Sequence, residues 1–421
     1  MRGFYIRAMQ AGGDDQGRLR VHVTTASGNT PISGAKIAVS YTGEPDRQLE
    51  ELTTDSSGQT EEIELAAPPL EYSVEPSEQQ PYSEYTLSVT APGFEPVEVV
   101  GAEILPDVTA LQEIQMVPEQ GEAYERFVIP AHTLFGDYPP KIAEAEIKPT
   151  TETGEIVLSR VVVPEYVIVH DGVPTDNTAA NYWVRYRDYI KNVASSEIYA
   201  TWTDAAIRAN VLAIMSFTLN RVYTEWYRNK GYDFTITSST AFDHKWIHNR
   251  NIYETISRVV DEMFGNYLSR PNVKQPILTQ YCDGRRVTCP NWMSQWGSQA
   301  LGEQGYSAIQ ILRNYYGESM YINTAEEISG VPYSWPGTNL TEGSRGQKVL
   351  QLQEQLNRIA QAYPAIPKIS EDGIYGPATA ASVRTFQSIF GLPATGIVDY
   401  PTWYKVSEIY VAVSRIAELN P

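Results

Sequence analysis

Glu197 is the residue whose surroundings best suit acid–base chemistry. It lies in the small, mostly neutral run Val193-Ala-Ser-Ser-Glu-Ile-Tyr-Ala-Thr-Trp202, before a segment, 205–222, whose apolar residues recur at helical spacing. Burial penalises the charged form of a carboxyl group, so its pKa rises and it can donate a proton near neutral pH. The pattern predicts a buried helix after a candidate general acid. From spacing alone, the more common explanation is an acidic residue that caps or pairs near a helix start.

Two ordered blocks resemble the stage II sporulation protein D family, which includes amidase enhancers. The first block is Val193 to Trp202 with Ala206-Ile-Arg-Ala-Asn210, and the second runs from Met293-Ser-Gln-Trp-Gly to Gly317. In that family the glutamate matching Glu197 is the catalytic acid of a lytic transglycosylase that cleaves peptidoglycan strands. The resemblance implies that Glu197 protonates the glycosidic oxygen. As a carboxylate it then takes the proton from the sugar's own 6-hydroxyl, so no second carboxylate is needed, unlike in hydrolysing glycosidases.

The chain departs from the family pattern near Glu197. Tyr199 stands where the family usually has proline, and Asn210, Met215 and Ser216 stand where it tends to carry glutamine and an Arg-Thr pair. The missing arginine removes a cation that could orient a carboxylate or a sugar. The resemblance therefore supports the fold more strongly than the activity.

Three downstream residues are candidates for holding a glycan beside Glu197. They are Tyr281, Gln295 and Trp296. Aromatic faces can stack on the apolar C–H surface of sugar rings and amides can bind hydroxyls, although Trp296 is equally suited to core packing.

Cys282 and Cys289 are the two cysteines of the chain, and the pair Asp283-Gly284 between them indicates a tight turn. An antiparallel hairpin would bring the thiols together, either free or as a disulfide. A zinc site is the alternative, and it would need two more ligands, such as His244 or His248. No cofactor is expected.

The last part of the chain, 340–421, predicts three short helices, the second beginning after a cap at Gly376-Pro377. It resembles the three-helix peptidoglycan-binding domain of many cell-wall hydrolases through Gly343-Ser-Arg-Gly346, Asp372-Gly-Ile-Tyr-Gly376 and Thr402-Trp403. The resemblance implies ligand contact in the loop from Asp372 to Tyr375.

The first part of the chain, 17–118, alternates apolar and polar residues between turn motifs, which predicts an antiparallel β-sandwich. Pro31 to Ala35, Asp55-Ser-Ser-Gly58 and Tyr85 to Phe94 resemble carboxypeptidase regulatory-like domains. Such domains are usually non-catalytic spacers or adhesion modules, so self-assembly or partner proteins could use this part.

The composition limits the classes of binding partner that we expect. The chain has 32 lysine and arginine residues against 51 aspartate and glutamate residues, which gives a net charge of −19. It has no dense basic runs that could neutralise phosphates, so we do not expect nucleic acid as a partner. No apolar run reaches the length of about 18 to 20 residues that spans a membrane. Residues 1–13 lack the apolar core of a signal peptide. Synthesis in the cytoplasm is expected, with action at the cell wall, at a spore surface or in a phage-like particle.

We therefore predict a multidomain protein: an all-β sandwich, an α+β domain and a small all-α bundle. The expected boundaries are an arm at 1–16, the sandwich at 17–118, a linker at 119–160, the central domain at 161–328, a linker at 329–339 and the bundle at 340–421. The predicted function is peptidoglycan binding and remodelling by lytic transglycosylation. The alternative is a non-catalytic assembly protein of a spore coat, spore appendage or phage tail.

Overall fold

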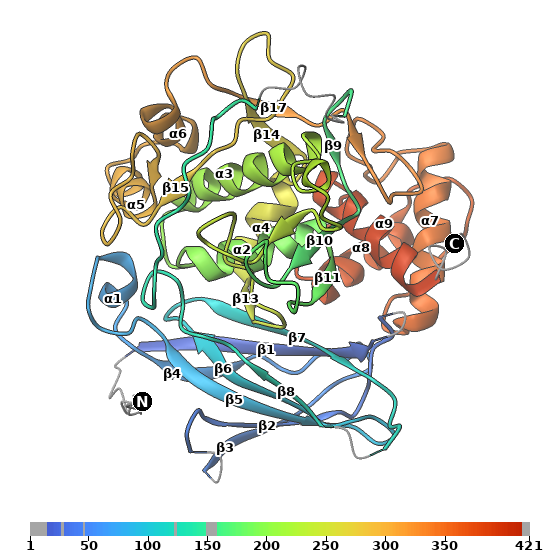
Figure 1. Cartoon of the computed structure of the whole chain (residues 1–421). Helices are drawn as coiled ribbons and strands as arrows, with labels where there is room; N and C mark the ends of the chain where they lie inside the picture. The colour runs from blue at the N-terminus through green and yellow to red at the C-terminus, as the bar shows by residue number, and fades with distance from the viewer. Residues whose placement is uncertain (1–14, 27–28, 45–46, 122–123, 149–157, 415–421) are drawn as a thin grey trace.

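The computed structural model describes residues 15–26, 29–44, 47–121, 124–148 and 158–414. The described residues form the predicted order of β-sandwich, α+β domain and helical bundle, which confirms the fold class. Figure 1 shows the sandwich below the central domain, with the C-terminal helices at one side of it. The predicted arm at 1–16 lies outside the described residues up to position 14, and residues 15–16 already belong to the first strand.

The sandwich contains two sheets whose strands alternate buried and exposed side chains, as Leu19, Val21 and Val23 show in β1. One sheet has the order β3-β2-β5-β6-β8 and the other β13-β7-β1-β4. The bounds are β1 (Asp15–Thr25), β2 (Lys36–Tyr41), β3 (Gln48–Thr53), β4 (Ile63–Ala67), α1 (Glu71–Val74), β5 (Ser83–Thr90), β6 (Val97–Ile104), β7 (Thr109–Met116), β8 (Glu125–Val128) and β13 (Ile252–Tyr253).

Two of these strands come from outside the predicted sandwich. β8 belongs to the predicted linker and pairs in parallel with β6, whereas β13 belongs to the central domain and pairs with β7. Glu103 of β6 also accepts from Arg250 at 2.9 Å in a buried ion pair. The sandwich is therefore built into the rest of the molecule and is not a detached spacer.

The central domain surrounds α3 (Asp204–Tyr223), the predicted buried helix. The apolar run Val161–Val169, which has the composition of a single strand, divides into β9 (Val162–Val163) and β10 (Tyr166–His170) at Pro164, which has no N–H to donate to a ladder. The segment 252–269 contains β13, α4 and β14 in turn. The remaining elements are β11 (Asn181–Arg185), α2 (Tyr186–Glu197), η1 (Arg228–Lys230), β12 (Ile236–Thr237), α4 (Glu254–Met263), β14 (Asn266–Ser269), β15 (Tyr281–Cys282), β16 (Met293–Ser294), α5 (Gln295–Glu303), α6 (Ala308–Tyr316), β17 (Tyr321–Thr324) and β18 (Glu327–Ile328).

The C-terminal bundle has the three predicted helices, α7 (Gln347–Ala362), α8 (Pro377–Ile389) and α9 (Tyr400–Ser414). Gly376 caps α8 and Pro377 opens it, as predicted. Within the described ranges, no helix combines the length and the apolar character needed to cross a membrane.

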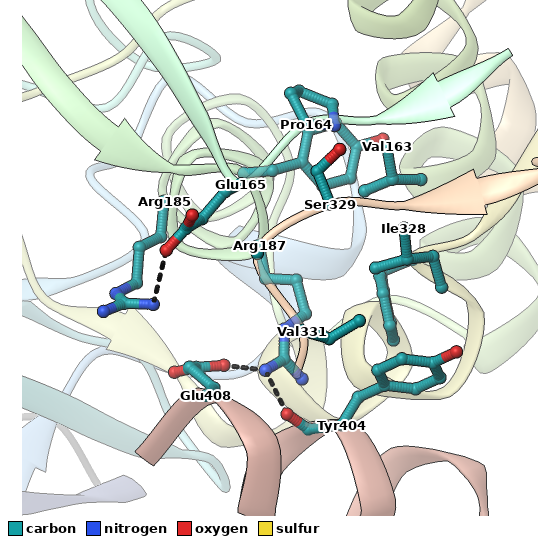
Figure 2. A pocket seen from close by; sticks show the side chains of 13 residues that line it. Val163, Pro164, Glu165, Arg185, Arg187, Ile328, Ser329, Val331, Tyr404 and Glu408 are labelled. Atoms are coloured by element: carbon teal, nitrogen blue, oxygen red, sulfur yellow. Dashed lines mark hydrogen bonds and ion pairs between the residues drawn. The ribbon is translucent and has the colours of Figure 1, made fainter. Parts of the chain in front are cut away.

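Helix α9 docks on the central domain through buried charges (Figure 2). Arg187 of α2 pairs with Glu408, donates to the carbonyl of Tyr404 at 3.2 Å and pairs with Asp261 at the same distance. A small pocket of about 50 Å³ remains beside these contacts, between Pro164, Val331 and α9. A pocket of this size holds one or two waters and no sugar, so its residues serve domain docking.

Candidate functional site around Glu197

Glu197 is the last residue of α2 and is fully buried. Its Oε1 accepts from the backbone N–H of Lys245 at 2.6 Å, and its Oε2 accepts from the Tyr281 hydroxyl. The expectation that Glu197 caps or pairs near a helix start is wrong, because the preceding residues form a helix that the sequence did not reveal. A carboxylate at a helix C-terminus faces the negative end of the dipole, which disfavours its charged form.

Burial raises the pKa of Glu197, and this is the largest effect on it. The nearby Lys141 ammonium, the Tyr281 hydroxyl and the Lys245 N–H partly offset the increase because they stabilise the carboxylate. The group therefore holds a proton more readily than an ordinary glutamate. This agrees with the electrostatic setting predicted for a general acid.

Residues 129–148, which we name the strap, cover this carboxyl group and run along the central domain (Figure 1). The Tyr138 hydroxyl lies 3.2 Å from Oε1 of Gln295, whose Nε2 donates to the Glu197 carbonyl at 3.1 Å. Lys141 donates to the Asp243 carbonyl, and its Nζ lies 4.7 Å from the centre of the Tyr281 ring. Tyr138 and Lys141 are themselves buried. Because Glu197 is fully buried, a glycan can reach it only if the groups packed around it move, and the strap is among them.

Three arginines hold the strap in place. Arg221 of α3 binds both carboxylate oxygens of Glu144, and Arg270 binds both of Glu146. Arg286 donates to the carbonyls of Leu134 at 2.9 Å and of Phe135 at 2.8 Å, and also to those of Thr133 and Gly136. The segment predicted as a linker is thus attached by charge-assisted bonds.

Arg221 is a buried cation in the helix that follows Glu197. Its Nε lies 2.7 Å from Oδ1 of Asp243, and its other nitrogens bind Glu144. It therefore neutralises the carboxylates of Asp243 and of Glu144 in the strap.

Cys282 and Cys289 form a disulfide. The predicted antiparallel hairpin between them is wrong, because β15 pairs in parallel with β16, Tyr281 opposite Met293. The cross-link closes a loop that carries Arg286, the residue that binds the strap carbonyls. Across the described part of the chain, no group of three or more His, Cys, Asp or Glu side chains is arranged to hold a metal ion. His244 instead stacks on Tyr281 with ring centres 5.9 Å apart.

The predicted glycan-binding residues of the central domain all lie near Glu197, but none is open to solvent. Tyr281 and Gln295 bind Glu197 directly, and Trp296 packs 5.1 Å from Trp202 and 6.0 Å from Tyr199. Tyr199, which replaces the family's proline, belongs to the same buried aromatic cluster. Contact with a glycan stays a prediction for these residues, and in this conformation they are structural.

In the C-terminal loop, Asp372 is exposed and Tyr375 is not. Oδ1 of Asp372 accepts from the backbone N–H of Ile374 at 2.9 Å and from Gln353, whereas the Tyr375 hydroxyl donates to the Gly396 carbonyl. Tyr375 therefore holds the bundle together, because its buried ring cannot touch a ligand unless the loop moves. Asp372 remains available as a contact.

Sequence reasoning missed Lys141 and the Lys245 N–H as neighbours of Glu197. They lie about 50 residues away in sequence, and no local pattern marks them. Long-range packing alone brings them together.

The C-terminal helices have a recognisable family pattern. Residues 345–406 match the model of a putative peptidoglycan binding domain. The chain is also 45% identical over 78 residues to a zinc D-Ala-D-Ala carboxypeptidase of Streptomyces albus G, a stretch that covers 18% of this chain and 29% of that relative. The match to a putative peptidoglycan binding domain thus covers most of the C-terminal bundle.

Two solved structures are each similar to a part of the chain. The SleB N-terminal domain is 26% identical, with 18% of this chain and 99% of that chain covered and a TM-score of 0.16. The minor pilin GBS52 of Streptococcus agalactiae is 17% identical, with 25% and 46% covered and a TM-score of 0.19. These likenesses are too local to describe the whole protein.

Proposed function

We propose that this protein binds peptidoglycan and acts at a cell wall or spore surface. The match of residues 345–406 to a peptidoglycan-binding domain carries the proposal. The carboxypeptidase relative is consistent with it, because its name places it among enzymes of D-alanyl peptides. The loop around the exposed Asp372, which connects α7 to α8, is the candidate surface for contact with peptidoglycan.

The complete burial of Glu197 favours a non-catalytic role for the central domain in this conformation. Its two carboxyl oxygens are already bound to Lys245 and Tyr281, and the strap covers it. The sandwich is fixed to the central domain by the β13–β7 pairing and by the Glu103–Arg250 ion pair. The sandwich and the central domain are thus joined by strand pairing and a buried ion pair, which suits an assembly or anchoring protein.

Lytic transglycosylation is the second candidate, and the raised pKa of Glu197 favours it. With the strap displaced, a protonated Glu197 would give its proton to the glycosidic oxygen as the bond to the leaving sugar breaks. The resulting carboxylate would take the proton of the 6-hydroxyl, whose oxygen closes the anhydro ring. Tyr281 would hold the carboxyl group in position throughout.

The test uses the full chain and a Glu197→Gln variant with isolated peptidoglycan. Sedimentation with the wall supports the binding proposal, and failure to sediment with it overturns the proposal. Mass analysis of the supernatant then separates the two candidates. Anhydro-ended fragments from the parent and none from Glu197→Gln establish transglycosylation. Binding without fragments from either protein leaves the non-catalytic role.

A further inference from the structure

A large cleft lies where the three domains meet, away from Glu197. We name it the three-domain cleft; its volume is about 580 Å³. Its walls include Arg20 and His22 of the sandwich, Tyr166, Trp183 and Arg185 of the central domain, and Lys405 of the bundle. Ligand sites of about 300 to 1,000 Å³ are common at domain interfaces.

The central wall of this cleft carries an exposed aromatic surface. Trp183 is 69% exposed on the edge strand β11, and its ring centre lies 6.4 Å from that of Tyr166 on β10. Nearby, Tyr182 stacks on His248 with ring centres 4.3 Å apart. An exposed tryptophan in a concave, partly polar site can stack on the apolar face of a sugar ring. This arrangement suits a glycan better than a small ion.

The charge of the cleft is opposite to that of the chain. Five lysine or arginine side chains and three aspartate or glutamate side chains line it, whereas the whole chain has 32 against 51. A concave site with an excess of one charge attracts ligands of the other. The cleft therefore favours an anionic ligand over a neutral one.

Arg185 is the cation best placed to bind that anion. It follows Trp183 by two residues on β11, so both side chains lie on one face of the strand. Its side chain forms a long ion pair with Glu165 at 3.9 Å and lies 5.3 Å from the centre of the Tyr166 ring, and among the described residues no side-chain hydrogen bond holds it. By contrast, Arg20 lies 3.1 Å from Glu254 and Lys191 lies 2.8 Å from Asp261. The Arg185 guanidinium is thus held less tightly than these two cations and can exchange its long contact with Glu165 for a ligand carboxylate.

We propose that the three-domain cleft binds a glycan strand that bears carboxylate groups, with Trp183 stacked on a sugar ring and Arg185 bound to a carboxylate. The proposal rests on the peptidoglycan binding proposed above and adds a second contact with the same polymer. One strand held by the cleft and by the C-terminal bundle would touch all three domains.

Calorimetric titration of the full chain tests this, with Glu197→Gln present throughout to prevent cleavage. The probes are soluble, peptide-free tetrasaccharides of peptidoglycan, which carry lactyl carboxylates, and the neutral chitotetraose. Trp183→Ala should weaken binding of both probes about tenfold, since stacking is lost. Arg185→Gln should weaken binding of the acidic probe about tenfold or more and leave chitotetraose unchanged. Both side chains lie at the cleft surface, so these changes leave the core intact.

Two exposed residues outside the cleft, Tyr306 and Arg228, provide matched controls. Tyr306→Ala and Arg228→Gln should bind both probes as the parent does. Unchanged affinity of Trp183→Ala for both probes overturns the proposal. An equal effect of Arg185→Gln on both probes overturns the part of the proposal in which Arg185 binds a carboxylate. If the parent sediments with walls but binds neither soluble probe, the cleft proposal fails while wall binding stands. If the parent also fails to sediment, the proposed function itself is wrong.

Discussion

The backbone N–H of Lys245 lies 2.6 Å from Oε1 of Glu197, across the C-terminal end of α2. With the Tyr281 hydroxyl on Oε2, both oxygens of the buried carboxyl group are bound by groups from distant parts of the chain. Glu197 is therefore part of the packed core as well as the candidate acid. Stability and activity can be tested separately at this site.

Tyr281→Phe should destabilise the fold by about 1 to 3 kcal/mol, because a buried carboxyl oxygen loses its donor. It should also raise the pKa of Glu197 further, since the hydroxyl opposes the effect of burial. Denaturant unfolding across a pH series measures both. Tyr316→Phe is the matched control, because that buried hydroxyl donates to the Gln280 carbonyl. It should lower stability without changing the pH dependence, and equal pH profiles for the two variants would contradict the prediction.

Glu197→Gln should flatten the pH dependence of stability. The folded pKa of Glu197 is raised above the unfolded value of about 4.3. In the pH window between these two pKa values, the folded state keeps a proton that the unfolded state has released. The parent's unfolding free energy therefore decreases as pH rises through the window, and the glutamine variant should lack this contribution. Guanidinium unfolding between about pH 4 and pH 8 measures it. Glu61→Gln, at an exposed position, should follow the parent, and a Glu197→Gln profile parallel to the parent's would refute the assignment.

Arg286→Ala should loosen the strap, because four carbonyls in residues 133–136 lose their shared donor. Hydrogen exchange of the strap amides should accelerate, while exchange in α3 stays slow. Arg285→Ala is the control, since that side chain binds Glu78 and the Ser77 carbonyl of the sandwich. If Glu197 is catalytic, Arg286→Ala should also release anhydro-ended fragments faster than the parent. Unchanged exchange in the strap would show that Arg286 does not hold it.

Asp261→Asn should destabilise the fold by about 3 to 5 kcal/mol and loosen the surface on which α9 docks, because buried Arg187 and Lys191 of α2 lose their shared carboxylate on α4. Burial alone would raise the pKa of Asp261, but Lys191, Lys405 and Arg187 hold it at about 2. The folded value is below the unfolded one of about 3.9, so the contribution is present above that pH and is lost as pH falls toward 2.

Thermal unfolding and limited proteolysis near residues 329–339 measure this docking. Asp204→Asn is the control, because Asp204 is 57% exposed in its pair with Arg208 and should cost less than about 1 kcal/mol. Equal loss in the two variants would contradict a specific role for Asp261.

The sequence by itself determined the three-part architecture, the buried helix 204–223 and the bundle with its Gly376-Pro377 cap. Those features follow from local periodicity and turn residues, which act over a few neighbouring positions. Helix α2 was missed because its apolar and polar residues are nearly all buried, so no amphipathic stripe marks it. The division of the Val161–Val169 run at Pro164 could have been predicted from the sequence, because proline has no backbone N–H to donate to a strand ladder.

Only the tertiary structure decided the state of Glu197 and the existence of the three-domain cleft. Lys141 reaches Tyr281 across 140 residues of chain, and Arg20 shares the cleft with Lys405. Such contacts depend on how domains dock, and docking here rests on long-range strand pairing and buried ion pairs such as Glu103–Arg250 and Arg187–Glu408. Local sequence carries no record of partners this distant, because burial and charge pairing are properties of the folded chain.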